Sequence, residues 1–222
     1  MQGNIKASNN SQSISIKMKT LSLLLVATTI VSGATFAAQT LYKDYPADVM
    51  PELSESGEFP VGVTTMEVTY PEAAMTMEGK METRGLTLEV WYPAQKATEN
   101  TLYSDETRSG QVFEIQADAS RDVAIAESES KFPIVVVSHG YTGYRTLMYY
   151  LGEHLASHGY VVAAIDHTDS TNKDVNFAEN PYSGFPSTLL NRSRDQVFTL
   201  NAVTDSEFFN ASVDATKAGV IG

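Results

Sequence analysis

The sequence predicts an α/β fold whose mostly parallel β-sheet carries helices on both faces. Residues 133–137 are continuously apolar, as expected of a strand that is buried on both faces of a sheet. A helical pattern over 146–158 follows, and a second apolar run over 160–165 comes after it. Strand, helix and strand in this order form a βαβ unit, which requires parallel strands. An apolar segment at 218–221 predicts a third parallel strand.

Residues 1–37 resemble a secretory signal peptide. Lys19 precedes an apolar run at 21–31, which is too short to span a bilayer comfortably, and small residues then lead to a cleavage point after Ala37. The polar residues before Met18 indicate that this methionine is an alternative start. The pattern predicts a secreted or periplasmic protein, and a buried core helix is the other interpretation of the apolar run.

The composition excludes several classes of function. The 222 residues contain 15 basic and 27 acidic side chains, a formal net charge of −12. Nucleic acids and anionic membrane surfaces both require cationic patches, so neither is an expected partner. The sequence has no cysteine, which excludes disulfides, thiolate metal sites, a cysteine nucleophile and the usual lipid attachment site after signal cleavage.

The stretch before the βαβ unit predicts a lead-in, two strands and a surface excursion. Residues 38–60 contain three prolines and suggest an extended segment. The β-branched run at 61–70 and the alternating run at 86–92 predict two strands that pair as antiparallel edge strands, with a long connection between them. The polar residues at 94–131 predict a surface excursion, with weak strand character at 112–115.

Two helices are expected to cover the sheet. Leucines at i, i+4 and i+8 in 146–158 indicate one apolar helix face, and Gly159 provides a C-terminal stop. A second helix is predicted over 188–204, on which Arg194 and Asp195 are expected to form an ion pair.

The loop after the first buried strand, residues 140–145, is consistent with two chemistries. Glycines between a strand and a helix occur in dinucleotide sites, where an acidic residue such as Asp166 at the end of the next strand holds the ribose. However, Tyr141 and its neighbours do not match G-x-G-x-x-G. The second chemistry is acyl transfer, in which donors around this loop stabilise an oxyanion.

The motifs around this loop resemble a known family. The segments 132–146 (FPIVVVSHGYTGYRT) and 155–167 (LASHGYVVAAIDH) are similar to α/β-hydrolases of the dienelactone-hydrolase-like group, particularly to bacterial relatives of platelet-activating-factor acetylhydrolase. The Gly-Tyr-Thr loop also resembles that of secreted polyester hydrolases and cutinases. The resemblance implies a three-layer α/β-hydrolase fold that is incomplete at the C-terminus, with 61–222 as the N-terminal portion of the domain.

The resemblance also implies an activity and a set of site residues. The complete protein would be a serine esterase or lipase that hydrolyses small-molecule, lipid or polyester carboxylic esters without a metal or cofactor. The backbone N–H of Tyr141 would donate to the oxyanion. Four further residues would contact the substrate: Gly140, Thr142, Tyr144 and His167. For His167, a hydrogen bond that anchors the loop is the other interpretation.

The catalytic serine is expected outside the sequence. No Gly-x-Ser-x-Gly motif occurs in it, and the resemblance places the serine directly after Gly222, with the aspartate and histidine of the triad further on. The 222 residues alone would then be an inactive fragment. A non-catalytic secreted binding protein on the same fold and, less favoured, a dinucleotide-binding oxidoreductase remain alternatives.

Other polar residues have simpler interpretations. Ser138 lacks the sharp turn that exposes a nucleophile, so it is not expected to attack a substrate. His139 is expected to support the geometry of the loop. His154 and His158 lie one helical turn apart, a spacing that a metal can use, but with no third ligand nearby they are expected on a helix surface.

Overall fold

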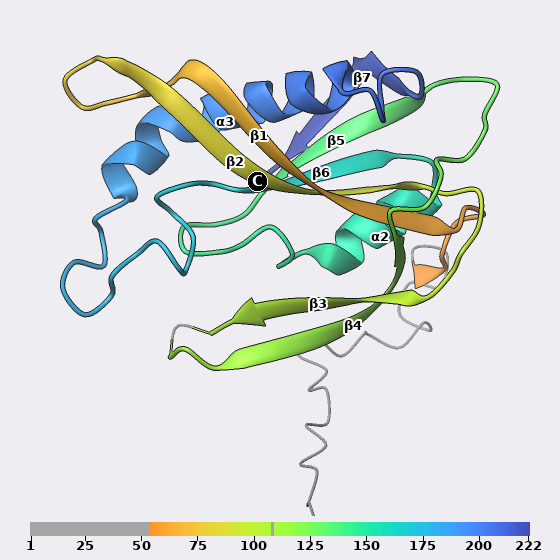
Figure 1. The fold of residues 1–222 in the computed structure, drawn as a ribbon, viewed down its shortest axis with the longest axis horizontal. Helices are drawn as coiled ribbons and strands as arrows, with labels where there is room; N and C mark the ends of the chain where they lie inside the picture. The colour runs from red at the N-terminus through yellow and green to blue at the C-terminus, as the bar shows by residue number, and fades with distance from the viewer. Residues whose placement is uncertain (1–53, 108) are drawn as a thin grey trace, which may run out of the picture. The chain divides into compact units, whose positions relative to one another are not determined.

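The structure, a computed structural model, describes residues 54–107 and 109–222 as one seven-stranded sheet with two helices (Figure 1). The predicted signal peptide and most of the predicted lead-in lie outside the described residues. The strands are β1 (Val61–Met75), β2 (Met81–Pro93), β3 (Asn100–Glu106), β4 (Val112–Arg121), β5 (Phe132–Ser138), β6 (Val161–Asp166) and β7 (Val213–Ile221), and the helices are α2 (Tyr149–Ser157) and α3 (Phe185–Asp205).

The order of the sheet is β3-β4-β1-β2-β6-β5-β7. β5 pairs in parallel with β6 on one side and β7 on the other, so Val136 lies beside both Ala163 and Val220. This confirms the predicted βαβ unit and third parallel strand. β1, β2 and β6 pair antiparallel, which makes the sheet mixed.

The two helices cover opposite faces of the sheet (Figure 1). Alternate strand residues form two separate cores: Val90 and Val136 pack with side chains of α3, whereas Trp91 and Val137 pack with those of α2. The first helix packs through small residues, because a Cβ on Gly152 would lie only 2.5 Å from the Trp91 ring. The leucine face predicted for this helix is therefore only half-buried.

The prediction of antiparallel edge strands was wrong in two respects. β1 and β2 do pair antiparallel, but both are interior strands, since β4 pairs with β1 and β6 pairs with β2. The predicted long connection is mostly strand, so that only 76–80 remain between them. Pro71 is accommodated because the register shifts between Tyr70 and Ala74.

The predicted surface excursion contains a β-hairpin formed by β3 and β4. In the middle of β4 the inward positions are apolar (Ile115, Ala117 and Ala119) and the positions between them are polar and exposed. The segment looks polar overall because half of its residues face solvent.

The buried face of α3 is unusually polar. Asn191, Asp195 and Thr199 are buried, whereas Leu189 and Val197 are 72% and 61% exposed. Two large apolar side chains of this helix therefore lie on its outer face. Within residues 54–107 and 109–222, neither helix combines the length and the apolar character that crossing a membrane requires.

Candidate functional site

The candidate site lies at the carboxyl edge of the parallel strands, where ligands of open α/β sheets bind. The loop that leaves β5 begins with His139 and Gly140, and α2 starts at Tyr149. β7 ends at the same edge, with Ile221 beside Val137. Two segments that are distant in sequence therefore meet here.

One peptide group of this loop is fixed from two directions. The carbonyl oxygen of Gly140 accepts hydrogen bonds from His139 Nδ1 at 2.7 Å and from the backbone N–H of Gly143 at 2.9 Å. Because a trans peptide directs its N–H opposite to its C=O, the N–H of Tyr141 points away from these donors. It donates no hydrogen bond to any residue in the described part of the chain. The loop thus presents a fixed donor of the kind that stabilises an oxyanion.

His139 is held as a neutral ring. Its Nε2 accepts the backbone N–H of His167 at 3.3 Å, so the proton must be on Nδ1, which donates to Gly140. The ring is buried, and burial lowers the pKa of His139 to about 3. Gly143 makes this packing possible, because a Cβ at that position would lie 2.9 Å from His139 Cβ. His139 therefore supports the loop, as the sequence predicted.

This neutral ring predicts an acid-sensitive step in stability. In the unfolded chain His139 takes up a proton near its ordinary pKa of 6.5, whereas in the folded chain it does so only near 3. The unfolded state binds more protons between these values, so stability is complete above pH 6.5 and is lost as the pH falls. One such group contributes a slope of about 1.4 kcal/mol per pH unit.

The substitution His139→Asn keeps a donor for the Gly140 carbonyl but removes the titration. We measure the free energy of unfolding with urea at several pH values between 3 and 6.5. We expect it to depend less steeply on pH in this variant than in the wild type, by an amount equivalent to about one bound proton. Equal slopes in the two proteins would show that His139 is protonated in the folded state.

Three side chains beneath the loop form a hydrogen-bonded chain. Ser138 Oγ lies 2.8 Å from His167 Nε2, and His167 Nδ1 lies 2.8 Å from Asp195 Oδ2. Burial lowers the pKa of His167, which is 1% exposed. Burial opposes ionisation of Asp195, but hydrogen bonds from His167 and Arg84 outweigh it and lower the pKa of this carboxyl.

The Ser138–His167–Asp195 hydrogen bonds follow the order of a Ser-His-Asp triad. Their buried environment is nevertheless typical of a structural network. Ser138 is 4% exposed and belongs to the regular ladder of β5 opposite Ile165. Asp195 is also paired with Arg84, which donates to both carboxylate oxygens at 3.0 and 2.8 Å. Ser138 therefore lacks the exposed turn that a nucleophile needs, which agrees with the sequence analysis.

Two sequence predictions need correction here. Of the two interpretations of His167, substrate contact is wrong, because the ring is buried in this network and does not line the pocket. Its backbone N–H instead anchors the loop through His139. Its position at a strand end suggested exposure, whereas the side chain of Asp195 draws it inward. Asp195 pairs with Arg84 and not with Arg194, whose Nε donates to the Ala73 carbonyl at 3.1 Å.

Arg192 connects α3 to the loop. Its guanidinium donates to the His139 carbonyl and to Ser170 Oγ, the latter at 3.1 Å. It holds the start of the loop against the segment after β6. No sequence signal pointed to this role, because helical spacing does not show which polar residues face a strand end.

The acidic residue considered for ribose binding is already engaged. Asp166 accepts hydrogen bonds from the backbone and the guanidinium of Arg145, both at 2.5 Å. Arg145 also pairs with the buried Glu89 at 3.0 Å. The carboxylate thus orders the end of the loop, which weakens the dinucleotide interpretation.

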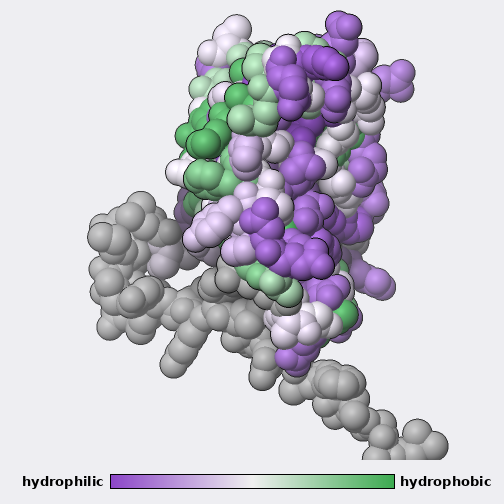
Figure 2. All heavy atoms as spheres, turned by 90° about the vertical axis from the view of Figure 1, so that its left-hand side faces the viewer, coloured by the Kyte–Doolittle hydropathy of each residue, from purple (hydrophilic) through white to green (hydrophobic). Residues whose placement is uncertain are grey.

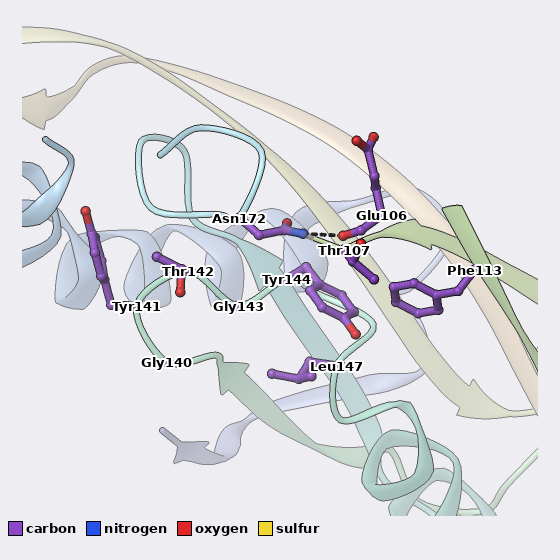
Figure 3. Close-up of a pocket in the computed structure, with 10 residues that line it drawn as sticks. All are labelled: Glu106, Thr107, Phe113, Gly140, Tyr141, Thr142, Gly143, Tyr144, Leu147 and Asn172. Carbon is purple, nitrogen blue, oxygen red and sulfur yellow. Dashed lines mark hydrogen bonds between the residues drawn. The ribbon is translucent and has the colours of Figure 1, made fainter. Parts of the chain in front are cut away.

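A pocket of about 480 Å³ opens beside the loop (Figure 3). Gly140, Thr142 and Tyr144 line it together with Tyr141, and their contact with substrate stays a prediction. Sequence analysis missed the residues that the β3–β4 hairpin and neighbouring loops contribute, which are Glu106, Thr107, Phe113, Leu147 and Asn172. Alternation along β4 was a signal for Phe113 alone, since Leu147 and Asn172 lie in loops outside the hairpin.

The ring of Tyr141 packs at the other side of the loop. Its hydroxyl donates to the Pro181 carbonyl at 3.1 Å, and its ring meets that of Phe185 edge-on at 5.6 Å. These contacts connect the loop to the segment before α3.

His154 and His158, which lie one turn apart at α2, have no third metal ligand near them within the described ranges. No group of three or more histidine, aspartate or glutamate side chains in them is arranged to hold an ion. The rings of His154 and His158 lie 4.6 Å apart, and His158 Nε2 lies 3.2 Å from the Glu55 carbonyl.

Comparisons with known proteins agree with this architecture. Residues 106–185 match the family described as platelet-activating factor acetylhydrolase, isoform II. The dog and bovine platelet-activating factor acetylhydrolases are 49% and 44% identical over 41 residues, which span 18% of this chain and only 9% of each relative.

A solved structure, ferulic acid esterase from Streptomyces cinnamoneus, is similar over 76% of this chain and 53% of its own, with 23% identity and a TM-score of 0.55. The chain therefore has the α/β-hydrolase fold, and its pocket loop lies within the segment that matches the acetylhydrolase family.

Proposed function

We propose that the protein is a secreted serine esterase that hydrolyses carboxylic esters and uses the Tyr141 N–H as an oxyanion donor. The observation that carries the proposal is this N–H, which His139 and Gly143 hold toward the sheet edge without another partner. A donor fixed before the reaction stabilises the negative charge that develops on the carbonyl oxygen. Secretion rests on the signal-peptide pattern of residues 1–37.

The nucleophile in this proposal is a serine that follows Gly222 in the full-length protein. β7 runs parallel to β5 and ends beside it, so the next turn would face the Tyr141 loop. The serine oxygen attacks the ester carbonyl while a histidine takes its proton, and an aspartate orients that histidine. The histidine returns the proton to the leaving alcohol, and water then releases the acid. The 222 residues alone would be inactive.

The comparisons support the reaction class. The names of the similar proteins refer to the acetyl group of platelet-activating factor and to ferulic acid esters. Because the matched segments cover only part of each protein, substrate choice does not transfer directly. The shared chemistry is the hydrolysis of a carboxylic ester.

The experiment combines hydrolysis with identification of the nucleophile. The full-length protein is incubated with p-nitrophenyl acetate, then with a fluorophosphonate probe, and the modified residue is located by mass spectrometry. We expect ester hydrolysis and modification of one serine after Gly222. Ser138→Ala is the control, and it should still be modified.

Two outcomes would contradict the proposal. Modification of Ser138 itself would make the buried Ser138–His167–Asp195 chain the catalytic one. Ester binding without hydrolysis or modification would favour the non-catalytic binding protein.

A further inference from the structure

We propose that the pocket beside Tyr141 binds an uncharged aromatic group of the substrate, and that Phe113 on the β3–β4 hairpin determines this preference. The inference rests on the proposed ester hydrolysis and specifies its substrate class.

Two aromatic side chains from different elements lie next to each other in the lining of the pocket. β4 carries Phe113, and the loop before α2 carries Tyr144; their ring centroids lie 6.2 Å apart with a tilt of 59°. Figure 3 shows the two side chains reaching toward each other, with Leu147 near them. Aromatic rings favour tilted and edge-on contacts, so this pair offers suitable surfaces to a third ring.

The hairpin is anchored to the rest of the site. The Asn172 side-chain amide donates to the Glu106 carbonyl. Asp105 accepts a hydrogen bond from Thr146 Oγ1 at 3.5 Å and pairs with Lys173 at 3.1 Å. The wall that carries Phe113 is thus fixed before a ligand arrives, which reduces the entropy cost of binding.

The pocket is continuous with the proposed oxyanion donor. Gly140 lines it, and the position that a Cβ would take there has no other atom within 4 Å. An ester whose carbonyl oxygen reached the Tyr141 N–H could therefore extend one of its groups over Gly140 toward Phe113. A volume of about 480 Å³ is ample for one ring.

Charge disfavours an anionic ligand. The charged side chain among the described lining residues is Glu106, and the whole sequence carries a net charge of −12. Anionic groups would be repelled, and an apolar ring makes no demand for a charged partner.

The test uses amide analogues, so that it needs no hydrolysis. Binding of acetanilide and of N-cyclohexylacetamide to the full-length protein is measured by NMR titration. The wild type should bind acetanilide more tightly, and Phe113→Ala should weaken acetanilide binding roughly three- to tenfold. Val112→Ala is the matched control, because this neighbouring residue is 64% exposed on the other face of β4.

A second variant distinguishes loss of the aromatic ring from loss of the folded structure. Phe113→Leu keeps an apolar side chain without a ring, and it should remove the preference for acetanilide while retaining binding of the cyclohexyl compound. Equal binding of the two amides by the wild type, or an unchanged preference in Phe113→Leu, would overturn the inference.

Kinetics with phenyl acetate and cyclohexyl acetate separate this inference from the proposed function. Hydrolysis of neither ester, together with ring-dependent amide binding, would reject the esterase and retain the aromatic site. Hydrolysis of both with no selective effect of Phe113→Leu would retain the esterase and reject the aromatic site.

Discussion

Replacing Tyr141 by proline is expected to reduce kcat for ester hydrolysis by about 10²–10³-fold, the usual effect of removing one oxyanion donor. Proline lacks the backbone N–H but can occupy this position, because Tyr141 is not among the residues with positive φ. Since the N–H donates to no described residue, its removal should affect the reaction more than the fold. The measurement is steady-state hydrolysis of p-nitrophenyl acetate by the full-length protein.

Tyr141→Ala is the matched control for this prediction. It removes the contacts of the ring with Phe185 and the Pro181 carbonyl but keeps the N–H. We therefore expect kcat to fall much less in Tyr141→Ala than in Tyr141→Pro, with similar melting temperatures. Equal losses of kcat in the two variants would show that the side chain, and not the N–H, matters at this position.

Replacing Arg84 by alanine is expected to destabilise the protein by about 3–5 kcal/mol. Arg84 is 5% exposed and donates to both oxygens of Asp195, which is itself buried. Without it, the Asp195 carboxylate retains His167 but loses its counter-charge, and an uncompensated buried charge is costly. Urea unfolding of the full-length protein at pH 7 measures the effect.

An exposed ion pair provides the comparison. Lys217 pairs with Asp214 at 3.3 Å, and the lysine side chain is 62% exposed. We expect Lys217→Ala to change the free energy of unfolding by no more than about 1 kcal/mol. Similar losses in Lys217→Ala and Arg84→Ala would contradict a special role for the buried pair.

The Arg84–Asp195 pair also matters for the site. Asp195 holds His167, whose backbone N–H donates to His139 and whose ring holds Ser138. The orientation of the Gly140–Tyr141 peptide thus depends on a network that crosses from β2 to α3.

The sequence by itself determined the parallel centre of the fold. The continuous apolar runs of β5 and β6 predicted strands that are buried on both faces of a parallel sheet, and the structure confirms them. Gly159 predicted the end of the intervening helix, and it has φ +90° there. The Gly140–Tyr144 loop was identifiable because it follows such a strand directly. The partial match to an acetylhydrolase family over 106–185 covers this same region.

Only the tertiary structure decided where the remaining elements and polar side chains lie. Exposed, mostly polar residues alternate with buried ones along both strands of the β3–β4 hairpin, so its composition predicted a surface excursion. Phe113 became a pocket residue because that hairpin folds back beside the loop. His167 turned inward because Asp195, Arg84 and Ser138 converge on it from three elements. Such convergence depends on contacts between residues far apart in the chain, which local periodicity and motif spacing do not encode.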